Sequence, residues 1–339
     1  MDIENNHRKT PSTQIALRCF QSGDEVALNE LFNTTFATSR ELKSWQWKFR
    51  GYNQPSLPLI VLAFVGDRLV GAYSAIKLEM AVNGKMTSVY QAVDTAVAKE
   101  YRGQGLRGQM FRCFIKELNR RGAKLLYGFP NPTLLKSAER QGDYYDLGSF
   151  RVFRRPLAAD NGGSRRQESI EAREIDSYYP YSSHCEQLAE QIGTSSRFAV
   201  FRSAEYLEHR YSDNPDRSFK RFLLFANDRA EAHLVYSIVQ AQGRKRAEVY
   251  ELYGVDSESV AERAVAALIA LAKSDSLAEI VCYLRGQKSF EEALLKAGFT
   301  CAEDERMRAA IAFPNPELVT VEGALERESW YLSYGDTDL

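Results

Sequence analysis

The sequence predicts a mixed α/β (α+β) protein made of two similar halves in tandem, each a largely antiparallel sheet with helices on both faces. The main observation is an internal repeat, because the same features recur in the same order at a nearly constant offset. Each half has an apolar strand that ends in a turn, Gly66-Asp67 or Asn227-Asp228, and both pairs are typical of β-hairpins because they tolerate positive φ. The neighbouring residues that correspond are Phe64, Asp67 and Arg68 in the first half, and Phe225, Asp228 and Arg229 in the second.

The elements of the first half follow from the spacing of its apolar residues. Two helices are predicted where these residues recur at helical spacing, and we interpret both stripes as core packing. The stripes are Val26, Leu28, Leu31 and Phe32, and then Met110, Phe111, Phe114, Ile115 and Leu118. In order, the predicted elements are a helix over 24–36, the hairpin, a strand over 89–97, a helix over 106–121, a strand over 124–129 and a helix that ends at Gly142.

The second half repeats this order. After its hairpin it has a strand over 249–255, a helix, a strand over 279–284 and a helix that ends at Gly298. The polar stretch AADNGGSRRQES, residues 158–169, predicts an interdomain linker. The sequence therefore predicts two domains, over 1–157 and 170–339, and 339 residues are enough for both.

Composition excludes several classes of function. The formal net charge is -1, so no overall field favours nucleic acid or an anionic membrane. The five cysteines are far apart and form no CxxC pair, which argues against zinc sites and disulfide frameworks, and we expect no metal. The polar start and the lack of a long apolar run predict no signal peptide and no membrane span. We expect a cytoplasmic protein, and the sequence does not indicate an oligomeric state.

The stretch AVAKEYRGQGLRGQMF, residues 96–111, joins a predicted strand to a predicted helix. The first N–H groups of a helix have no helical partner, and the helix dipole favours an anion beside them. Gly103 and Gly105 lack a Cβ, so the backbone can turn sharply and approach a phosphate. Arg102 and Arg107 add charged hydrogen-bond donors. The loop is therefore predicted to hold the pyrophosphate of a cofactor.

Other nucleotide motifs fit this loop less well. A P-loop requires G-x-x-x-x-G-K-[ST], and the lysine and the hydroxyl residue are missing. The run 103–108 does satisfy G-x-G-x-x-G, but an antiparallel hairpin precedes it where a dinucleotide fold would begin with a parallel βαβ unit. The remaining alternative is a glycine-containing helix start that binds no ligand.

The longer stretch DTAVAKEYRGQGLRGQMF resembles the coenzyme A signature of the GNAT-type N-acetyltransferase superfamily, a strand followed by [Q/R]-x-x-G-x-[G/A] at a helix start. Arg107 replaces the last small residue of that signature, and a glycine follows one step later. The element order over 14–156 is also similar to this family, and the whole chain resembles bacterial proteins with two such domains in tandem. The residues that carry the signature are Arg102, Gly103, Gln104, Gly105, Leu106, Arg107 and Gly108.

The resemblance implies acetyl-CoA as the co-substrate and a small-molecule amine as the acceptor, with an amino sugar as one candidate. It also implies that the backbone of the strand at Ala96 and Val97 pairs with the pantetheine arm as an added strand does. Asn131 matches a position that often binds the same arm, although Asn-Pro is also ordinary helix-entry chemistry.

The second half lacks the features of the glycine loop. Its equivalent, YGVDSESVAERAV over 253–265, has Asp256 and Glu258 where phosphate oxygens would lie, and carboxylates repel phosphate. We therefore expect a degenerate second domain that completes a substrate cleft or packs against the first.

Acyl transfer to an amine requires a base for the amine and an acid for the leaving thiolate. Asp94 is the candidate catalytic residue, because it lies within an apolar strand that would flank the cofactor, although a hydrogen-bonded structural aspartate explains it as well. The resemblance implies a tyrosine as the acid, but Ala138 occupies that position. Tyr144 and Tyr145 lie nearby as substitutes, with strand packing as the alternative.

Candidate substrate-binding residues come from aromatic and acidic positions. Trp47 and Tyr145 offer rings, with core packing as the alternative for Trp47. The end of the sequence, WYLSYGDTDL, brings Asp336 and Asp338 to an interdomain cleft, or else forms a disordered acidic end.

The sequence thus predicts an acyl-CoA-dependent N-acyltransferase, most simply an N-acetyltransferase, with its active site in the first half. Two alternatives stay open. One is an aminoacyl transferase of the Fem type, which the neutral charge disfavours because such enzymes use tRNA. The other is a catalytically degenerate protein that binds coenzyme A as a sensor or assembly partner.

Overall fold

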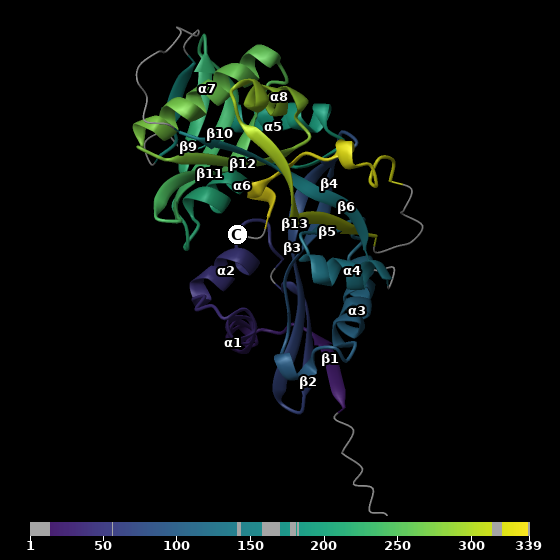
Figure 1. Cartoon of the computed structure of the whole chain (residues 1–339). Coiled ribbons are helices and arrows are strands. Elements are labelled where there is room, and N and C mark those ends of the chain that lie inside the picture. The colour runs from purple at the N-terminus through teal and green to yellow at the C-terminus, as the bar shows by residue number, and fades with distance from the viewer. Residues whose placement is uncertain are drawn as a thin grey trace, which may run out of the picture.

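A computed structural model of the protein describes residues 14–55, 57–140, 144–157, 170–176, 181, 183–313 and 321–337. The predicted linker over 158–169, Gly142 and Asp338 lie outside these residues. In Figure 1 the two halves of the chain are stacked end to end, with the last described residues of the chain between them.

The first half alternates helices with long strands. Its strands and helices are β1 (Ile15–Cys19), α1 (Glu25–Phe36), α2 (Leu42–Arg50), β2 (Leu59–Val65), β3 (Arg68–Val82), β4 (Lys85–Val97), α3 (Leu106–Arg120), β5 (Leu126–Gly128), α4 (Pro132–Arg140) and β6 (Tyr145–Pro156). Helices α1 and α2 cover one face of this sheet, and α3 and α4 cover the other (Figure 1).

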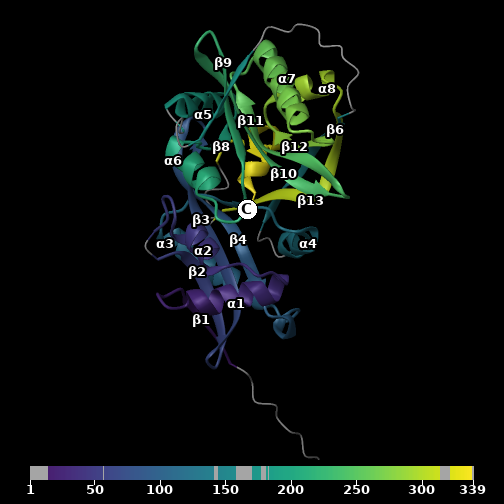
Figure 2. The same ribbon diagram turned by 90° about the vertical axis from the view of Figure 1, so that its left-hand side faces the viewer.

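The second half repeats this pattern. Its elements are β7 (Glu171–Glu174), α5 (Ser183–Ser195), β8 (Phe198–Val200), α6 (Ala204–Leu207), a π-helical turn (Glu208–Ser212), β9 (Lys220–Ala226), β10 (Arg229–Ala241), β11 (Arg244–Gly254), α7 (Glu258–Ser274), β12 (Glu279–Arg285), α8 (Lys288–Lys296) and β13 (Thr300–Ala312). Figure 2 shows α5 and α6 on one side of these strands and α7 and α8 on the other.

The predicted hairpin turns are present at both positions. Gly66 has φ 57°, and Asn227 and Asp228 have φ 50° and 58°. Each turn closes a two-residue loop, with Val65 opposite Arg68 and Ala226 opposite Arg229. Positive φ at these residues lets the two strands leave the turn with their natural twist.

Most residues of the two helix stripes are buried as predicted, but Phe32 and Ile115 are only half-buried and Val26 is exposed. Met110, Phe114 and Leu118 have no exposed surface, so α3 packs its apolar face on the sheet. Val26 is 57% exposed, which corrects its prediction as a core residue. It precedes Leu28 by two positions, about 200° around the helix, and therefore faces away from the core.

The strands of both halves form one sheet of 14 strands, in which the halves exchange their last strands. Its order is β1-β2-β3-β4-β5-β13-β6-β12-β11-β10-β9-β7, with β8 on β3 and β14 (Leu332–Ser333) on β12. Strand β13 of the second half pairs with β5 of the first, and β6 of the first half pairs with β12 of the second. The two exchanged strands pair with each other at the centre.

The predicted mixed α/β class with a largely antiparallel sheet and helices is confirmed. The predicted boundary at residue 157 does not account for the strand exchange. Strand β6 precedes that boundary in the sequence, but it lies beside strands of the second half. Within the described residues, no helix is long and apolar enough to cross a membrane.

Candidate functional site

The glycine loop between β4 and α3 is open to solvent. Gly103 and Gly105 have φ 76° and 75°, a conformation that favours glycine. A Cβ built on either residue would meet no heavy atom within 4 Å, and residues 102–105 are all exposed. Helix α3 then begins at Leu106 without a side-chain cap on its first N–H groups.

The loop presents unpaired backbone donors. Within the described part of the chain, no group accepts a hydrogen bond from the N–H of Gly103, Gln104 or Gly105. Donors of this kind at a helix start form an anion site, and the helix dipole supports it by about 0.3–1 kcal/mol. The Arg102 Nε donates to the Val97 carbonyl at 2.9 Å, so this guanidinium lies beside the loop.

Strands β4 and β5 pair only briefly and then separate. Parallel pairing runs from Tyr90 to Ala92 on β4, and β5 ends at Gly128. Beyond this point β4 continues to Val97 on β3 alone, with a register shift and φ 49° at Asp94. The pocket at the separation is here called the β4–β5 cleft. It is lined by Phe36, Tyr73, Ala92, Val93, Asp94, Thr95, Gly128, Phe129, Pro130, Asn131, Leu134 and Tyr144.

The separation leaves the edge of β4 over 93–97 without a strand partner on the β5 side. This edge includes Ala96 and Val97, and both pair with β3 on their other side. Asn131 lies at the cleft, where its Oδ1 accepts from the Leu134 N–H at 2.9 Å as α4 begins. An extended ligand arm could add to this edge as a strand does.

Asp94 lies in the cleft between two cations. Its carboxylate contacts the Arg40 guanidinium on one oxygen and the Lys48 ammonium on the other, the latter at 3.1 Å. All three side chains are nearly buried, with 4% of Asp94 exposed. The two cations compensate the charge of the buried carboxylate.

A second pocket lies where the two halves meet, and Lys48 lines it as well. This junction pocket is formed by Trp47, Lys48, Tyr52, Gln54, Ile76 and Leu78 from the first half, and by Tyr206, His209, Arg210 and Thr337 from the second. The pair of Lys48 with Asp94 therefore connects the junction pocket to the β4–β5 cleft.

Trp47 is held in the junction pocket by the second half. Its Nε1 donates to the His209 carbonyl at 2.8 Å, and the two rings stack 5.1 Å apart. Burial lowers the pKa of His209, so its ring favours the neutral form. Trp45, two positions earlier, is wholly buried in the core.

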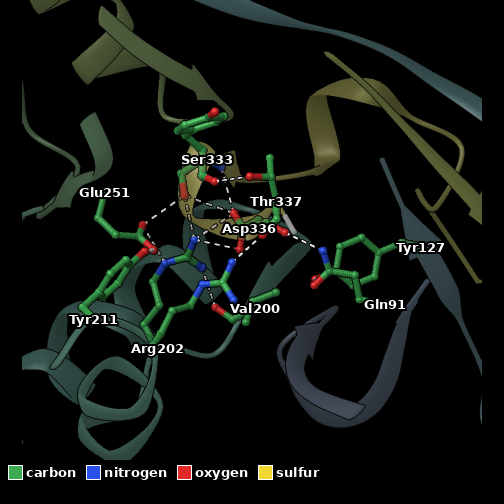
Figure 3. A network of polar contacts seen from close by, with 11 residues as sticks. Gln91, Tyr127, Val200, Arg202, Tyr211, Glu251, Ser333, Asp336 and Thr337 are labelled. Carbon is green, nitrogen blue, oxygen red and sulfur yellow. Dashed lines mark hydrogen bonds and ion pairs between the residues drawn. The ribbon is translucent and has the colours of Figure 1, made fainter. Parts of the chain in front are cut away.

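The end of the chain is packed between the halves instead of forming a loose acidic end. Asp336 is 1% exposed, and its carboxylate accepts from the Arg202 guanidinium at 2.8 Å. Arg202 also pairs with Glu251 at 3.0 Å and has no exposed surface (Figure 3). The Asp336 carbonyl accepts from the Gln91 side chain on β4 at 2.8 Å. The geometry therefore favours a structural role for Asp336 over contact with a substrate.

Tyr145 and Tyr144 point to different surroundings. Tyr145 is 42% exposed, touches Phe313 edge-on and lines neither pocket. Tyr144 is buried, and its hydroxyl is hydrogen-bonded to that of Tyr73 within the β4–β5 cleft. Of the two tyrosines that the sequence analysis names, the structure therefore brings Tyr144 to the cleft that Asp94 and Asn131 line, and not Tyr145.

In the second half, the tail of the chain, residues 330–337, fills the matching position. Strands β11 and β12 pair up to Val249 and Cys282, and beyond this β14 of the tail pairs with β12. The fit is close, since a Cβ on Gly335 would lie 2.2 Å from the Tyr211 hydroxyl. The carboxylates Asp256 and Glu258, at the position of the glycine loop, bond to Ser289 and Lys296.

We expect one acetyl-CoA per chain, because the tail closes the second cleft while the first is open. Isothermal titration calorimetry of the full chain measures this stoichiometry. Two equivalent sites would contradict the interpretation of the tail as a plug.

Sequence reasoning missed the partners of Asp94. Arg40 and Lys48 are separated from it by 54 and 46 residues, and no local pattern links them. The apolar run Trp330-Tyr331-Leu332 is the feature that could have predicted a packed tail, and all three residues are buried.

The first half of the sequence matches a family model, and the chain is similar in fold to solved structures. A family model described as an acetyltransferase (GNAT) domain matches residues 16–142, which contain the glycine loop and Asp94. A GCN5-related N-acetyltransferase from Anabaena variabilis is similar in structure, with TM-score 0.70 and 12% identity over 89% of this chain and 73% of that chain.

Two further solved structures are similar. A conserved protein of unknown function from Enterococcus faecalis, titled a probable N-acyltransferase, has TM-score 0.68 and 14% identity over 88% of this chain and 72% of its own. A GCN5-related N-acetyltransferase from Kribbella flavida has TM-score 0.61 and 16% identity over 88% and 71%. At these identities the structures show a shared fold. No curated protein matches the sequence.

Proposed function

We propose that the protein transfers an acyl group, most simply acetyl, from coenzyme A to an amine of a small molecule. The match of residues 16–142 to a family model described as an acetyltransferase (GNAT) domain supports this proposal. The observation that carries this proposal is the open glycine loop, whose unpaired donors at 103–105 lie at the start of α3. A pyrophosphate needs both the donors and the space, and the described chain offers both.

The residues of the first half would divide the work of binding. The loop over 102–108 would hold the pyrophosphate, with Arg102 as a charged donor beside it. The free edge of β4 at Ala96 and Val97, together with Asn131, would hold the pantetheine arm and direct the thioester into the β4–β5 cleft.

The chemistry forms a C–N bond and breaks the C–S bond of the thioester. The amine must lose a proton and the thiolate must gain one. Asp94 faces this cleft, and an ionised carboxylate there would accept a hydrogen bond from the incoming amine and orient it for attack. Arg40 and Lys48 would fix the position of the carboxylate.

The acceptor would approach Asp94 on the face covered by α1 and α2. The junction pocket on this face is small, about 30 Å³, and Lys48 in its wall pairs with Asp94. An amino sugar is the acceptor class to test first, because the resemblance implies it. A thiol-release assay with acetyl-CoA over a panel of amines identifies the acceptor.

Asp94→Asn is expected to lower kcat by about 100-fold or more, because the amide keeps the shape of the side chain but loses its charge. Acetyl-CoA affinity should change little, since the glycine loop is untouched. Steady-state kinetics and calorimetry measure the two quantities.

The matched control is Asp275→Asn in the second half. Asp275 also pairs with a lysine, Lys220, at 2.6 Å, but lies outside both pockets. This variant should keep wild-type turnover. If Asp94→Asn also turned over at the wild-type rate, Asp94 would have no part in the mechanism.

One observation favours a second candidate function, a protein that binds coenzyme A without catalysis. Ala138 is fully buried at the position where the resemblance implies the acid tyrosine. Tight acetyl-CoA binding with no thiol release for any amine would support this sensor.

A further inference from the structure

The two halves place a carboxylate at matching points of their sheets. Asp94 lies on β4, two positions after the last residue that pairs with β5. Glu251 lies on β11, likewise two positions after the last residue that pairs with β12. In the first half, Arg40 and Lys48 both form ion pairs with Asp94. The internal repeat therefore leads us to expect two cations on Glu251 as well.

Only the first of the two expected cations binds Glu251. Arg202 and Arg210 have the same separation in the sequence as the two cations of the first half. Arg202 pairs with Glu251 at 3.0 Å. The second contact on Glu251 comes from the Tyr211 hydroxyl at 2.7 Å, and Arg210 points elsewhere. Arg210 is therefore a cation without the carboxylate of its own half.

A π-helical turn accounts for the different direction of Arg210. Lys48 lies within the regular helix α2, whereas Arg210 lies in the π turn over Glu208–Ser212. There the Asp213 N–H donates to the Glu208 carbonyl, five residues back, at 3.0 Å. The extra residue rotates the following side chains relative to an α-helix, and such turns are frequent at functional sites. Arg210 thereby lines the junction pocket beside Lys48.

The charge of Arg210 is not balanced in this pocket. Arg210 is only 6% exposed, its guanidinium donates to the Thr337 carbonyl, and its Nε is buried without an acceptor. The neighbouring carboxylate of Asp336 is paired with Arg202. Among the described residues, no carboxylate lies within ion-pair distance of Arg210, and none lines the pocket. Because a carbonyl carries only a partial charge, a buried guanidinium in these surroundings favours an anion as its partner.

Resting on the proposed function, we propose that Arg210 binds an acidic group of the acceptor, so that the substrates are amines that carry a carboxylate. The volume of the junction pocket, about 30 Å³, suits a group of a few heavy atoms such as a carboxylate. Lys48 lines this pocket and contacts Asp94 at 3.1 Å, so the two sites adjoin. A carboxylate beside Arg210 and an amine beside Asp94 can therefore belong to one small molecule.

The first test uses the wild type with matched acceptors. A thiol-release assay with acetyl-CoA compares amino acids with the corresponding amides, beginning with glycine and β-alanine, and includes glucosamine as an amine without an acidic group. The acid of each reactive pair should have a kcat/KM about 10-fold higher or more, chiefly through a lower KM. The reason is that a hydrogen bond to a charged group is lost with the amide.

Arg210→Gln tests the assignment to this residue. Glutamine keeps a donor for the Thr337 carbonyl but removes the charge. We expect the KM of the acids to rise about 10-fold and the KM of the amides to stay the same. Arg210→Lys, which keeps the charge, should restore part of the preference. The matched control is Arg217→Gln, because this exposed arginine of the same half lines neither pocket and its variant should keep the preference.

Thermal unfolding gives a readout that does not depend on turnover. Because Arg210 has no carboxylate partner among the described residues, Arg210→Gln should melt at or above the wild-type temperature. The comparison variant is Arg202→Gln, at the matching first cation, which should melt well below the wild type because it leaves two buried carboxylates without their partner. An equally large drop for Arg210→Gln would show that the fold itself balances this guanidinium, and would overturn the proposal.

The outcomes distinguish this proposal from the function on which it rests. If the wild type accepts the amides or glucosamine as well as it accepts the acids, the anion site falls and the acyltransferase stands. An undiminished preference for acids in Arg210→Gln would likewise exclude Arg210 as its source. If no amine releases thiol from acetyl-CoA, the acyltransferase is removed, and this proposal with it.

Discussion

Gly105→Glu is expected to lower the affinity for acetyl-CoA by about 100-fold or more. The residue has φ 75°, and a Cβ there meets nothing within 4 Å, so a side chain fits without a clash. Its carboxylate would project from the start of α3, where the pyrophosphate needs unpaired N–H groups and positive potential. Repulsion between like charges and the strain of positive φ, about 1–2 kcal/mol, act together. Calorimetric titration with acetyl-CoA measures the loss.

Gly122→Glu is the matched control, because it isolates the charge at the loop from the strain. Gly122 follows the other end of the same helix, has φ 70° and likewise has open space around a built Cβ. This variant carries the same strain and the same added charge, and it should bind acetyl-CoA as the wild type does. Equal affinity in the two variants would show that the loop does not hold the pyrophosphate.

Arg202→Met is expected to destabilise the protein by about 3–5 kcal/mol, the usual cost of leaving buried charges without their partner. Arg202 has no exposed surface and pairs with both Glu251 and Asp336, as Figure 3 shows. Methionine fills much of the volume but leaves two carboxylates buried. Urea unfolding, followed by tryptophan fluorescence, measures the difference in the free energy of unfolding.

The loss should grow with pH. Burial raises the pKa of Glu251 above its usual value of 4.5, and Arg202 opposes that shift in the intact protein. Without Arg202 the folded-state pKa rises further. A carboxyl group with a raised pKa stabilises the fold below its unfolded pKa, and this stabilisation is lost as pH rises through the folded value. The wild type and Arg202→Met should therefore differ more at pH 8 than at pH 5.

Arg120→Met is the control for loss of an arginine from an ion pair. The Arg120 side chain is 72% exposed and pairs with Glu117 on the surface of α3. Exposed pairs of this kind contribute little to stability, so the variant should be nearly as stable as the wild type at both pH values. A similar loss in the two variants would show that burial of the Arg202 network is not the source of its effect.

The parts of the molecule that local chemistry determines could be predicted from the sequence. The glycine loop and the hairpin turns need positive φ, which only a few residue types adopt readily. The residue types at Gly103, Gly105 and Asn227 therefore predict the conformation found there. The stripe on α3 is similarly local, because its spacing alone defines a buried face.

The missing parts are contacts between distant segments. Strands β6 and β13 are both long, and no feature of either strand's sequence indicates in which half of the sheet it lies. The partner of Arg202 in the tail lies 134 residues away. Because Asp94 meets Arg40 and Lys48 only after α1 and α2 have packed on the sheet, its ion pairs could not be read from neighbouring residues.

The exchange of β6 and β13 has a consequence for how the molecule can be divided. A fragment that ended at residue 157 would keep the glycine loop, but β5 would lose its neighbour β13 and become a bare sheet edge, which favours aggregation. Its last strand, β6, would likewise lack both of its neighbours. Because each half supplies a strand to the sheet of the other, we expect the two halves to unfold in one cooperative transition.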